Sequence, residues 1–287
     1  MLTPYAADIF VVAFTYALVT LGLYLTLLSG QFSVAHASLM GIGGYMGGWA
    51  TTQWGLPFPV AIVLGGFAGA AGGLFIAFTL QRTSGILLGT VTIAIGQSFS
   101  LMAQNWQAIG GSQGLGGIPL YSTLPYATFL LVVGLAAVLF VQRTNFGWQV
   151  QAAGRDETVA KSLGISIMSV RYYGYGFGGF LAGLGGVLLA HHNGVIDPNN
   201  LSFASEPLFF IFLVLGGYSS AWGAVAGAVG VTWLMELLRF GGGKFLFLDQ
   251  QDRPWLLGLV LVIVLIISPD GAIRRKSKKT HLASAEA

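Results

Sequence analysis

Charged side chains are scarce in this protein of 287 residues. Asp, Glu, Lys and Arg together make up 8% of the chain, whereas soluble domains carry about 25%. Hydrophobic residues account for 55%, and the mean hydropathy is +0.76. So little charge excludes an ordinary soluble globular domain and predicts a protein that crosses the membrane several times. We expect membrane lipid, and no nucleic acid, to surround it.

The residues that most enzyme and metal sites need are also missing. Cysteine is absent, which excludes disulfides and thiol chemistry. His36 has no second His, Cys or carboxylate at ligand spacing, and the adjacent His191 and His192 do not share a helix face. The glycine-rich stretch 110–117 lacks the Gly-Lys-Ser/Thr ending of a phosphate-binding loop. Because no nucleophile–base pair or carboxylate pair is recognisable either, we expect no catalytic residue, metal or cofactor on this chain.

Long apolar runs are what the chain does contain, and a membrane-spanning helix needs about 20 apolar residues. The runs are continuous and do not alternate as in a β-barrel, so the predicted fold class is all-α with about eight to nine spans. Glycine is about twice as frequent as average, which favours close helix packing and broken helices. The predicted segments are 8–28, 36–52, 58–79, 84–103, 124–141, 171–192, 205–217, 221–239 and 255–268.

Lysine and arginine predict the orientation, because they concentrate in cytoplasmic loops. If the chain has nine spans, most of its lysines and arginines fall on one side of the membrane. This places the amino terminus outside the cell and the 142–170 loop in the cytoplasm. We expect one transmembrane domain over 1–273, followed by a basic, disordered, cytoplasmic tail over 274–287. The first span follows a segment without basic residues, so we interpret it as a retained anchor rather than a signal peptide.

One polar stretch, 147–166, interrupts the apolar pattern. Val150, Ala153, Val159, Ala160 and Leu163 follow roughly the spacing of one helical face. They predict a short amphipathic helix with Gly164 as its C-cap. Such a helix suits docking to a soluble partner, but a solvated connector or an interfacial helix explains the pattern equally well. The candidate docking residues are Gly154, Arg155, Asp156, Glu157, Lys161 and Gly164.

Polar side chains also occur within or beside the predicted spans, where such groups face protein or water rather than lipid. They are candidates for lining a transport pathway: Gln31, Ser33, His36, Ser38, Thr90, Thr92 and Gln97. Two alternatives remain open. The stretch 29–38 also fits a turn with Ser33 as a helix N-cap, and the residues near Thr92 also fit hydrogen bonds between helices.

Several stretches, taken in order, resemble the M-type permease subunits of branched-chain amino acid ABC importers. They are Gly30–Tyr45, Gly85–Thr92, Asn105-Trp106 with 110–119, Gly154–Glu157 with Leu163–Ile165, Asp197-Pro198, Ser202-Phe203, Leu215–Gly223 and Pro269–Gly271. The resemblance extends over about residues 20–273, and it is supported by the order and spacing of these stretches.

The resemblance implies the ABC importer permease fold and a set of partners in a bacterial inner membrane. These partners would be a second homologous permease, two cytosolic ATP-binding subunits and an extracytoplasmic solute-binding protein. ATP would bind the cytosolic subunits, and the 150–164 helix would couple its hydrolysis to import. The implied solute is a branched-chain or other amino acid; urea or amides are alternatives. An ion-coupled secondary transporter of a small polar solute is the alternative from another class.

Overall fold

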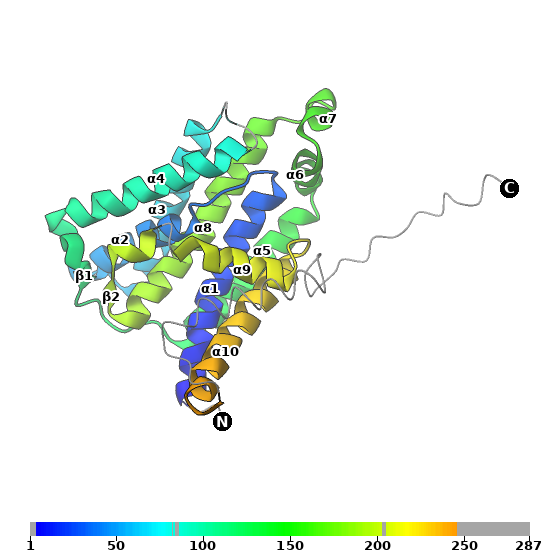
Figure 1. Cartoon of the computed structure of the whole chain (residues 1–287). Coiled ribbons are helices and arrows are strands. Elements are labelled where there is room, and N and C mark those ends of the chain that lie inside the picture. The colour runs from blue at the N-terminus through cyan, green and yellow to red at the C-terminus, as the bar shows by residue number, and fades with distance from the viewer. Residues whose placement is uncertain (1–3, 82, 84–85, 203–204, 246–287) are drawn as a thin grey trace.

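The computed structural model describes residues 4–81, 83, 86–202 and 205–245 (Figure 1). These residues form an all-α bundle, as predicted. The long helices are α1 (Pro4–Leu28), α2 (His36–Thr52), α3 (Phe58–Thr79), α4 (Ile86–Asn105), α5 (Leu124–Gln142), α8 (Ile167–Asn193) and α10 (Ala221–Phe245). The shorter ones are α6 (Asn145–Arg155), α7 (Glu157–Ser162) and α9 (Glu206–Gly216), with 3-10 turns η1 (Gln107–Ile109), η2 (Gly111–Gln113) and η3 (Pro198–Leu201).

Helix α8 lies at the centre of the bundle and packs against α1, α2 and α3 (Figure 1). Glycine makes this packing possible. A Cβ on Gly183 would collide with the Gly65 carbonyl oxygen of α3, and one on Gly43 of α2 would collide with Gly183 itself. With no side chain at these points, the three backbones come into direct contact. Dispersion between close backbones is a main source of helix association in lipid.

We therefore expect Gly183→Ala to destabilise the protein strongly. The added methyl group has backbone on the opposite side, so two helices must separate, at a cost of about 1–3 kcal/mol for overpacking. The control is Gly230→Ala in α10, where an added Cβ would meet nothing within 4 Å. Thermal unfolding in detergent should show a lower midpoint for Gly183→Ala and no loss for Gly230→Ala. Equal midpoints for both variants would contradict the close-packing account.

The number of membrane spans is lower than predicted in the described residues. Five helices are long and apolar enough to cross a membrane, or up to six if a bent pair counts as one. That pair is α9 with α10, whose axes differ by 116° across the turn at 217–220. Helix α2 has 17 residues and falls below the length of a full span. The count of eight to nine is not confirmed, and the predicted segment 255–268 and tail 274–287 lie outside the described residues.

The loop between α4 and α5 and the loop after α8 are joined to each other at the end of the bundle away from α6 and α7 (Figure 1). Strand β1 (Leu115–Gly116) pairs antiparallel with β2 (Val195–Ile196). Leu115, Ile118 and Ile196 form a small apolar cluster with Tyr45 of α2. This short sheet was not predicted, because strands of two residues have no detectable alternation in the sequence.

Candidate functional site

The polar stretch folds as two helices, so the prediction of a single amphipathic helix is wrong. Helix α6 ends at Arg155, and Asp156 has extended backbone angles. The Asp156 carboxylate then caps α7 by accepting hydrogen bonds from the backbone N–H groups of Thr158 (2.8 Å) and Val159 (3.0 Å). An Asp at this position satisfies amides that a helix start leaves unpaired. Asp156 is thus the junction between α6 and α7.

Gly164 ends α7 as the sequence predicts, one residue after the cap. Its φ of +77° lies in the left-handed region that favours glycine. The Gly164 N–H donates to the Lys161 carbonyl and the Ile165 N–H to the Ala160 carbonyl, both at 3.0 Å. These two bonds are the Schellman pattern of a helix terminus. The chain therefore leaves α7 in a fixed direction toward α8.

The break at Asp156 divides the predicted apolar face between two surfaces. Val150 and Ala153 of α6 and Ala160 of α7 are buried in a cluster with Val170 of α8. Three other large side chains are exposed instead: Trp148 (61%), Val159 (54%) and Leu163 (72%). Arg155 and Asp156 are exposed as well. Exposed apolar side chains gathered on one small unit are typical of a protein-binding surface.

An ion pair fastens α7 to the bundle. The buried Arg171 of α8 donates from Nη2 to the Glu157 carboxylate (3.3 Å) and from Nη1 to the carbonyl of Leu80 (2.9 Å) and that of Gln81 (3.1 Å) at the end of α3. Lys161 forms a second pair with Glu157 at 2.8 Å. Hydrogen bonding from Lys161, with the nearby Arg171 charge, holds the pKa of Glu157 below its ordinary value. One carboxylate therefore links α7 to the junction of α3 and α8.

This lowered pKa predicts a pH-dependent contribution to stability. The unfolded pKa of Glu is about 4.3, so the contribution is complete above that value. It is lost as the pH falls through the lower folded pKa. Because Glu157 is about one-third exposed, the contribution should not exceed about 1 kcal/mol. The difference in thermal midpoint between wild type and Glu157→Gln should be present at pH 7 and disappear in acid. A difference that grows in acid would contradict the assignment.

Helix α6 is held against the loop between α1 and α2 by a contact between two glycines. A Cβ on Gly154 would collide with the Leu28 carbonyl oxygen and lie 3.2 Å from the Gly30 nitrogen. A Cβ on Gly30, in turn, would lie 3.0 Å from the Gly154 Cα. Gly154, a predicted docking residue, is therefore also the inner attachment of α6. Helix α6 and this loop are therefore in direct backbone contact.

The loop leads into a buried polar cluster that contains most of the candidate pathway residues. The structure buries Gln31, Ser33, His36, Ser38 and Thr92, while Thr90 is exposed and Gln97 is half-buried. His36 Nε2 lies 3.1 Å from Thr26 Oγ1, which donates to the Gly174 carbonyl of α8 at 3.0 Å. The Val34 N–H donates to Thr92 Oγ1 of α4 at 3.0 Å. These polar groups join α1, α2, α4 and α8, and a pathway-lining role for them stays a prediction.

The cap of α2 comes from a residue that sequence reasoning did not select. Ser33 is not the N-cap; Ala35 occupies that position, and no local side chain caps the helix. Instead, the buried Glu206 carboxylate accepts from the His36 N–H (3.0 Å) and the Ala37 N–H (2.6 Å). Glu206 starts α9, and its Glu-Pro sequence signals only a helix start. No sequence pattern links positions 170 residues apart.

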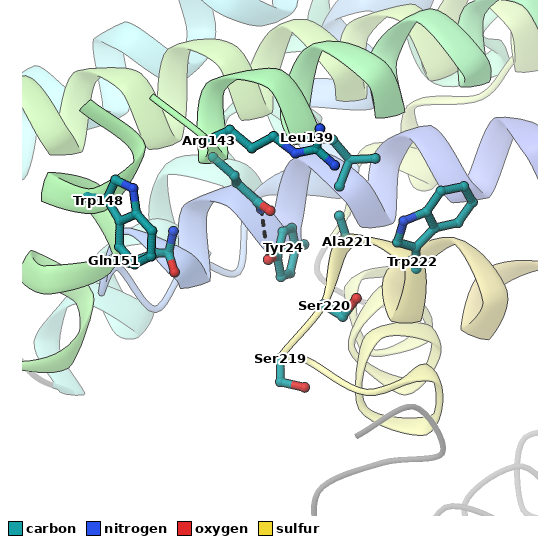
Figure 2. A pocket seen from close by; sticks show the side chains of 10 residues that line it. Tyr24, Leu139, Arg143, Trp148, Gln151, Ser219, Ser220, Ala221 and Trp222 are labelled. Carbon is teal, nitrogen blue, oxygen red and sulfur yellow. Dashed lines mark hydrogen bonds between the residues drawn. The ribbon is translucent and has the colours of Figure 1, made fainter. Parts of the chain in front are cut away.

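A cavity of about 390 Å³ opens beside α6 and the α9–α10 turn. Figure 2 shows Trp148 and Gln151 of α6 facing it from one side and Trp222 from the other, with Tyr24 between them. Gln142 donates to the Tyr24 hydroxyl at 2.9 Å, and Arg143 lies above this pair (Figure 2). Ser219 and Ser220 come from the turn itself. The cavity thus separates the unit that carries the exposed surface from the bend in the membrane helices.

The comparisons with known proteins decide the family. The family model described as "Branched-chain amino acid transport system / permease component" matches residues 5–269. The chain belongs to this permease family. It is 26% identical to the high-affinity branched-chain amino acid transport system permease protein LivM of Salmonella typhimurium, covering 100% of this chain and 74% of the relative. It is also 26% identical to the LivH permease of the same organism, covering 91% and 92%, and 26% identical to the autoinducer 2 import system permease protein LsrC of Yersinia enterocolitica, covering 90% and 72%. No solved structure matches the chain.

Membership of the permease family confirms the resemblance found in the sequence, and with it the role of an ABC importer permease. The helical, multi-pass membrane architecture agrees with it. Among the residues that the structure describes, no group of three or more His, Asp or Glu side chains is placed to hold a metal ion. The described residues thus contain three features outside ordinary helix packing: the α6–α7 unit, the buried polar cluster, and the cavity between α6 and the α9–α10 turn.

Proposed function

We propose that this permease forms half of the translocation pathway of an ATP-driven importer and receives its driving force through α6 and α7. One observation carries the proposal. The α6–α7 unit is fastened inward at Gly154 and Glu157, yet it presents Val159 and Leu163 outward. A unit with a rigid inner attachment and an apolar outer surface transmits force from a protein that binds it. The partners are a second permease, two cytosolic ATP-binding subunits and an extracytoplasmic binding protein.

The solute that we propose is a branched-chain or other amino acid. LivM and LivH, similar to this chain over most of its length, carry branched-chain amino acid transport in their names. The similarity to LsrC, named for autoinducer 2 import, indicates that related permeases serve chemically different solutes. Urea or amides are therefore included among the alternatives. The protein would lie in a bacterial inner membrane, with α6, α7 and the carboxyl terminus in the cytoplasm.

A secondary transporter is the second candidate, and Glu206 is the observation that favours it. Ion-coupled transporters use ionisable groups buried at membrane depth, and Glu206 is 1% exposed beside His36. However, both carboxylate oxygens of Glu206 accept hydrogen bonds from the start of α2. This bonding gives the buried carboxylate a structural task that needs no transported ion. We therefore favour the ATP-driven importer.

Reconstitution tests the two candidates together. The chain would be placed in liposomes with candidate partners, namely a second permease, ATP-binding subunits and a solute-binding protein. Uptake of leucine, isoleucine, valine, urea and amides would then be measured. We expect uptake that requires ATP. The double substitution Val159→Ser and Leu163→Ser should reduce it by about tenfold, as loss of interface hot spots does, while leaving the internal contacts of α7 in place. Uptake by the chain alone, driven by a proton or sodium gradient, would replace this proposal with the second candidate.

A further inference from the structure

Helix α2 begins inside the protein with no cap of its own. The first amides of a helix have no partner within it and must find one elsewhere. Ala35 offers no side-chain acceptor, and all the residues from Val34 to Ala37 are buried. The Glu206 carboxylate supplies both hydrogen bonds, one oxygen to each of the first two N–H groups. The partial positive charge of the helix terminus also favours a carboxylate there.

The same carboxylate fixes α9 in place. Glu206 is the first residue of α9, so its bonds hold that end of the helix directly against the start of α2. A ring contact supports the connection: Phe32 of the loop and Phe210 of α9 have centroids 5.4 Å apart. Glu206 therefore binds the start of α2, and Phe210 of α9 contacts the loop that leads into α2.

A continuous series of contacts therefore runs from α6 to the bend in the membrane helices. Gly154 of α6 presses on Leu28 and Gly30. The loop continues into α2, whose first amides bind Glu206. From there α9 leads after 11 residues to the 116° bend with α10. The contact at Gly154 is a close backbone contact, the contact at Glu206 is a pair of charge-assisted hydrogen bonds, and the residues 31–35 between them are buried except for Phe32.

We propose that Glu206 is a positioning residue for transport: it clamps the 29–36 segment to α9, so that displacement of α6 moves the bent α9–α10 pair. This inference rests on the proposed ATP-driven function, because it needs a force applied at α6. The clamp stays closed through the cycle, and the loop and α9 move as one body. Without it, α6 moves the loop but leaves the bend behind.

Glu206→Gln tests the clamp with almost no change in shape. The amide retains one acceptor oxygen but places an NH₂ donor against the second backbone N–H, so one hydrogen bond is lost. In the reconstituted importer we expect ATP hydrolysis to continue while solute taken up per ATP falls by about tenfold, the order expected for one unsatisfied buried group. Asp8→Asn, at an exposed carboxylate near the start of α1, is the matched control and should keep the wild-type ratio.

A cross-link separates a clamp from a merely stabilising contact. The chain has no native cysteine, so Phe32→Cys and Phe210→Cys introduce the only two thiols in it. A short, reducible bifunctional thiol reagent should join them and restore uptake per ATP in Glu206→Gln, and reduction should remove the rescue. An unchanged ratio in Glu206→Gln, or no rescue by the cross-link, would overturn the proposal.

The otherwise wild-type protein provides a test that does not depend on how Glu206→Gln folds. In the protein that retains Glu206, cross-linking Phe32→Cys to Phe210→Cys should leave uptake intact, since the 29–36 segment and α9 move together. Loss of uptake on cross-linking, regained on reduction, would show that they must separate and would overturn the clamp. Failure of the uncross-linked wild type to use ATP would instead refute the proposed function, so the two failures are distinguishable.

Discussion

Gly154→Val is expected to reduce ATP-driven uptake by at least about tenfold, because filling a closely packed contact costs about 1–3 kcal/mol and here displaces α6. The Cβ alone would collide with the Leu28 carbonyl oxygen, which is backbone and cannot move aside as a flexible side chain can. Helix α6 must therefore tilt away from the loop that it presses on. The exposed surface of α7 remains, so the ATPases should still bind and hydrolyse ATP.

The measurement for Gly154→Val is uptake and ATP hydrolysis in the same liposomes. Gly116→Ala is the control, since an added Cβ there meets nothing within 4 Å. We expect hydrolysis without matching uptake in Gly154→Val, and normal values of both in the control. Normal uptake in Gly154→Val would mean that the contact between α6 and the 28–30 segment carries no force.

Arg171→Met should have the largest effect on stability. Arg171 is 4% exposed, and its guanidinium is the partner of the Leu80 and Gln81 carbonyls and of the Glu157 carboxylate. Methionine fills much of the volume but donates nothing, so these acceptors lose a charged partner. A buried acceptor left without its hydrogen-bond donor costs about 1–3 kcal/mol, and the Leu80 and Gln81 carbonyls both lose theirs. The three helices α3, α7 and α8 lose their common connection.

Thermal unfolding in detergent measures this effect, with two further variants as controls. Arg171→Lys should recover only part of the loss, because an ammonium group cannot reproduce the planar fork of donors. Glu157→Gln should cost much less, since it removes only the charge of a partly exposed acceptor and leaves the bonds to α3. If Arg171→Met were no worse than Glu157→Gln, the bonds to the end of α3 would contribute nothing.

The sequence was a good guide to where helices lie and a poor guide to what joins them. The predicted segments 36–52 and 58–79 have the same bounds as α2 and α3, since apolar length and flanking polar residues determine both. The break at Asp156 was missed because apolar spacing was given more weight than the helix-start signal of Asp156 and Glu157. That signal could have been used, because a capping Asp before a polar first turn is a local pattern.

The contacts that define the candidate site could not be predicted from local patterns. Two contacts join positions more than 100 residues apart: Gly154 with Gly30, and Glu206 with the start of α2. Neither contact produces a periodic pattern in the sequence. Glu206 starts a helix, as its Glu-Pro sequence signals, but such a position is usually exposed. It is buried here because it lies against the start of α2, which is distant in the sequence.

The most direct test of the account is which side of the membrane α7 occupies and what it contacts there. Leu163, the C-cap residue of α7, is 72% exposed, and Leu120, at the opposite end of the bundle, is 70% exposed. Each is replaced singly by cysteine. In the assembled importer we predict that Leu163→Cys cross-links to an ATPase subunit and reacts with an impermeant thiol reagent only from the cytoplasmic side, whereas Leu120→Cys reacts only from outside. Labelling of Leu163→Cys from outside, or ATP-driven uptake without any contact between α7 and an ATPase, would contradict the account.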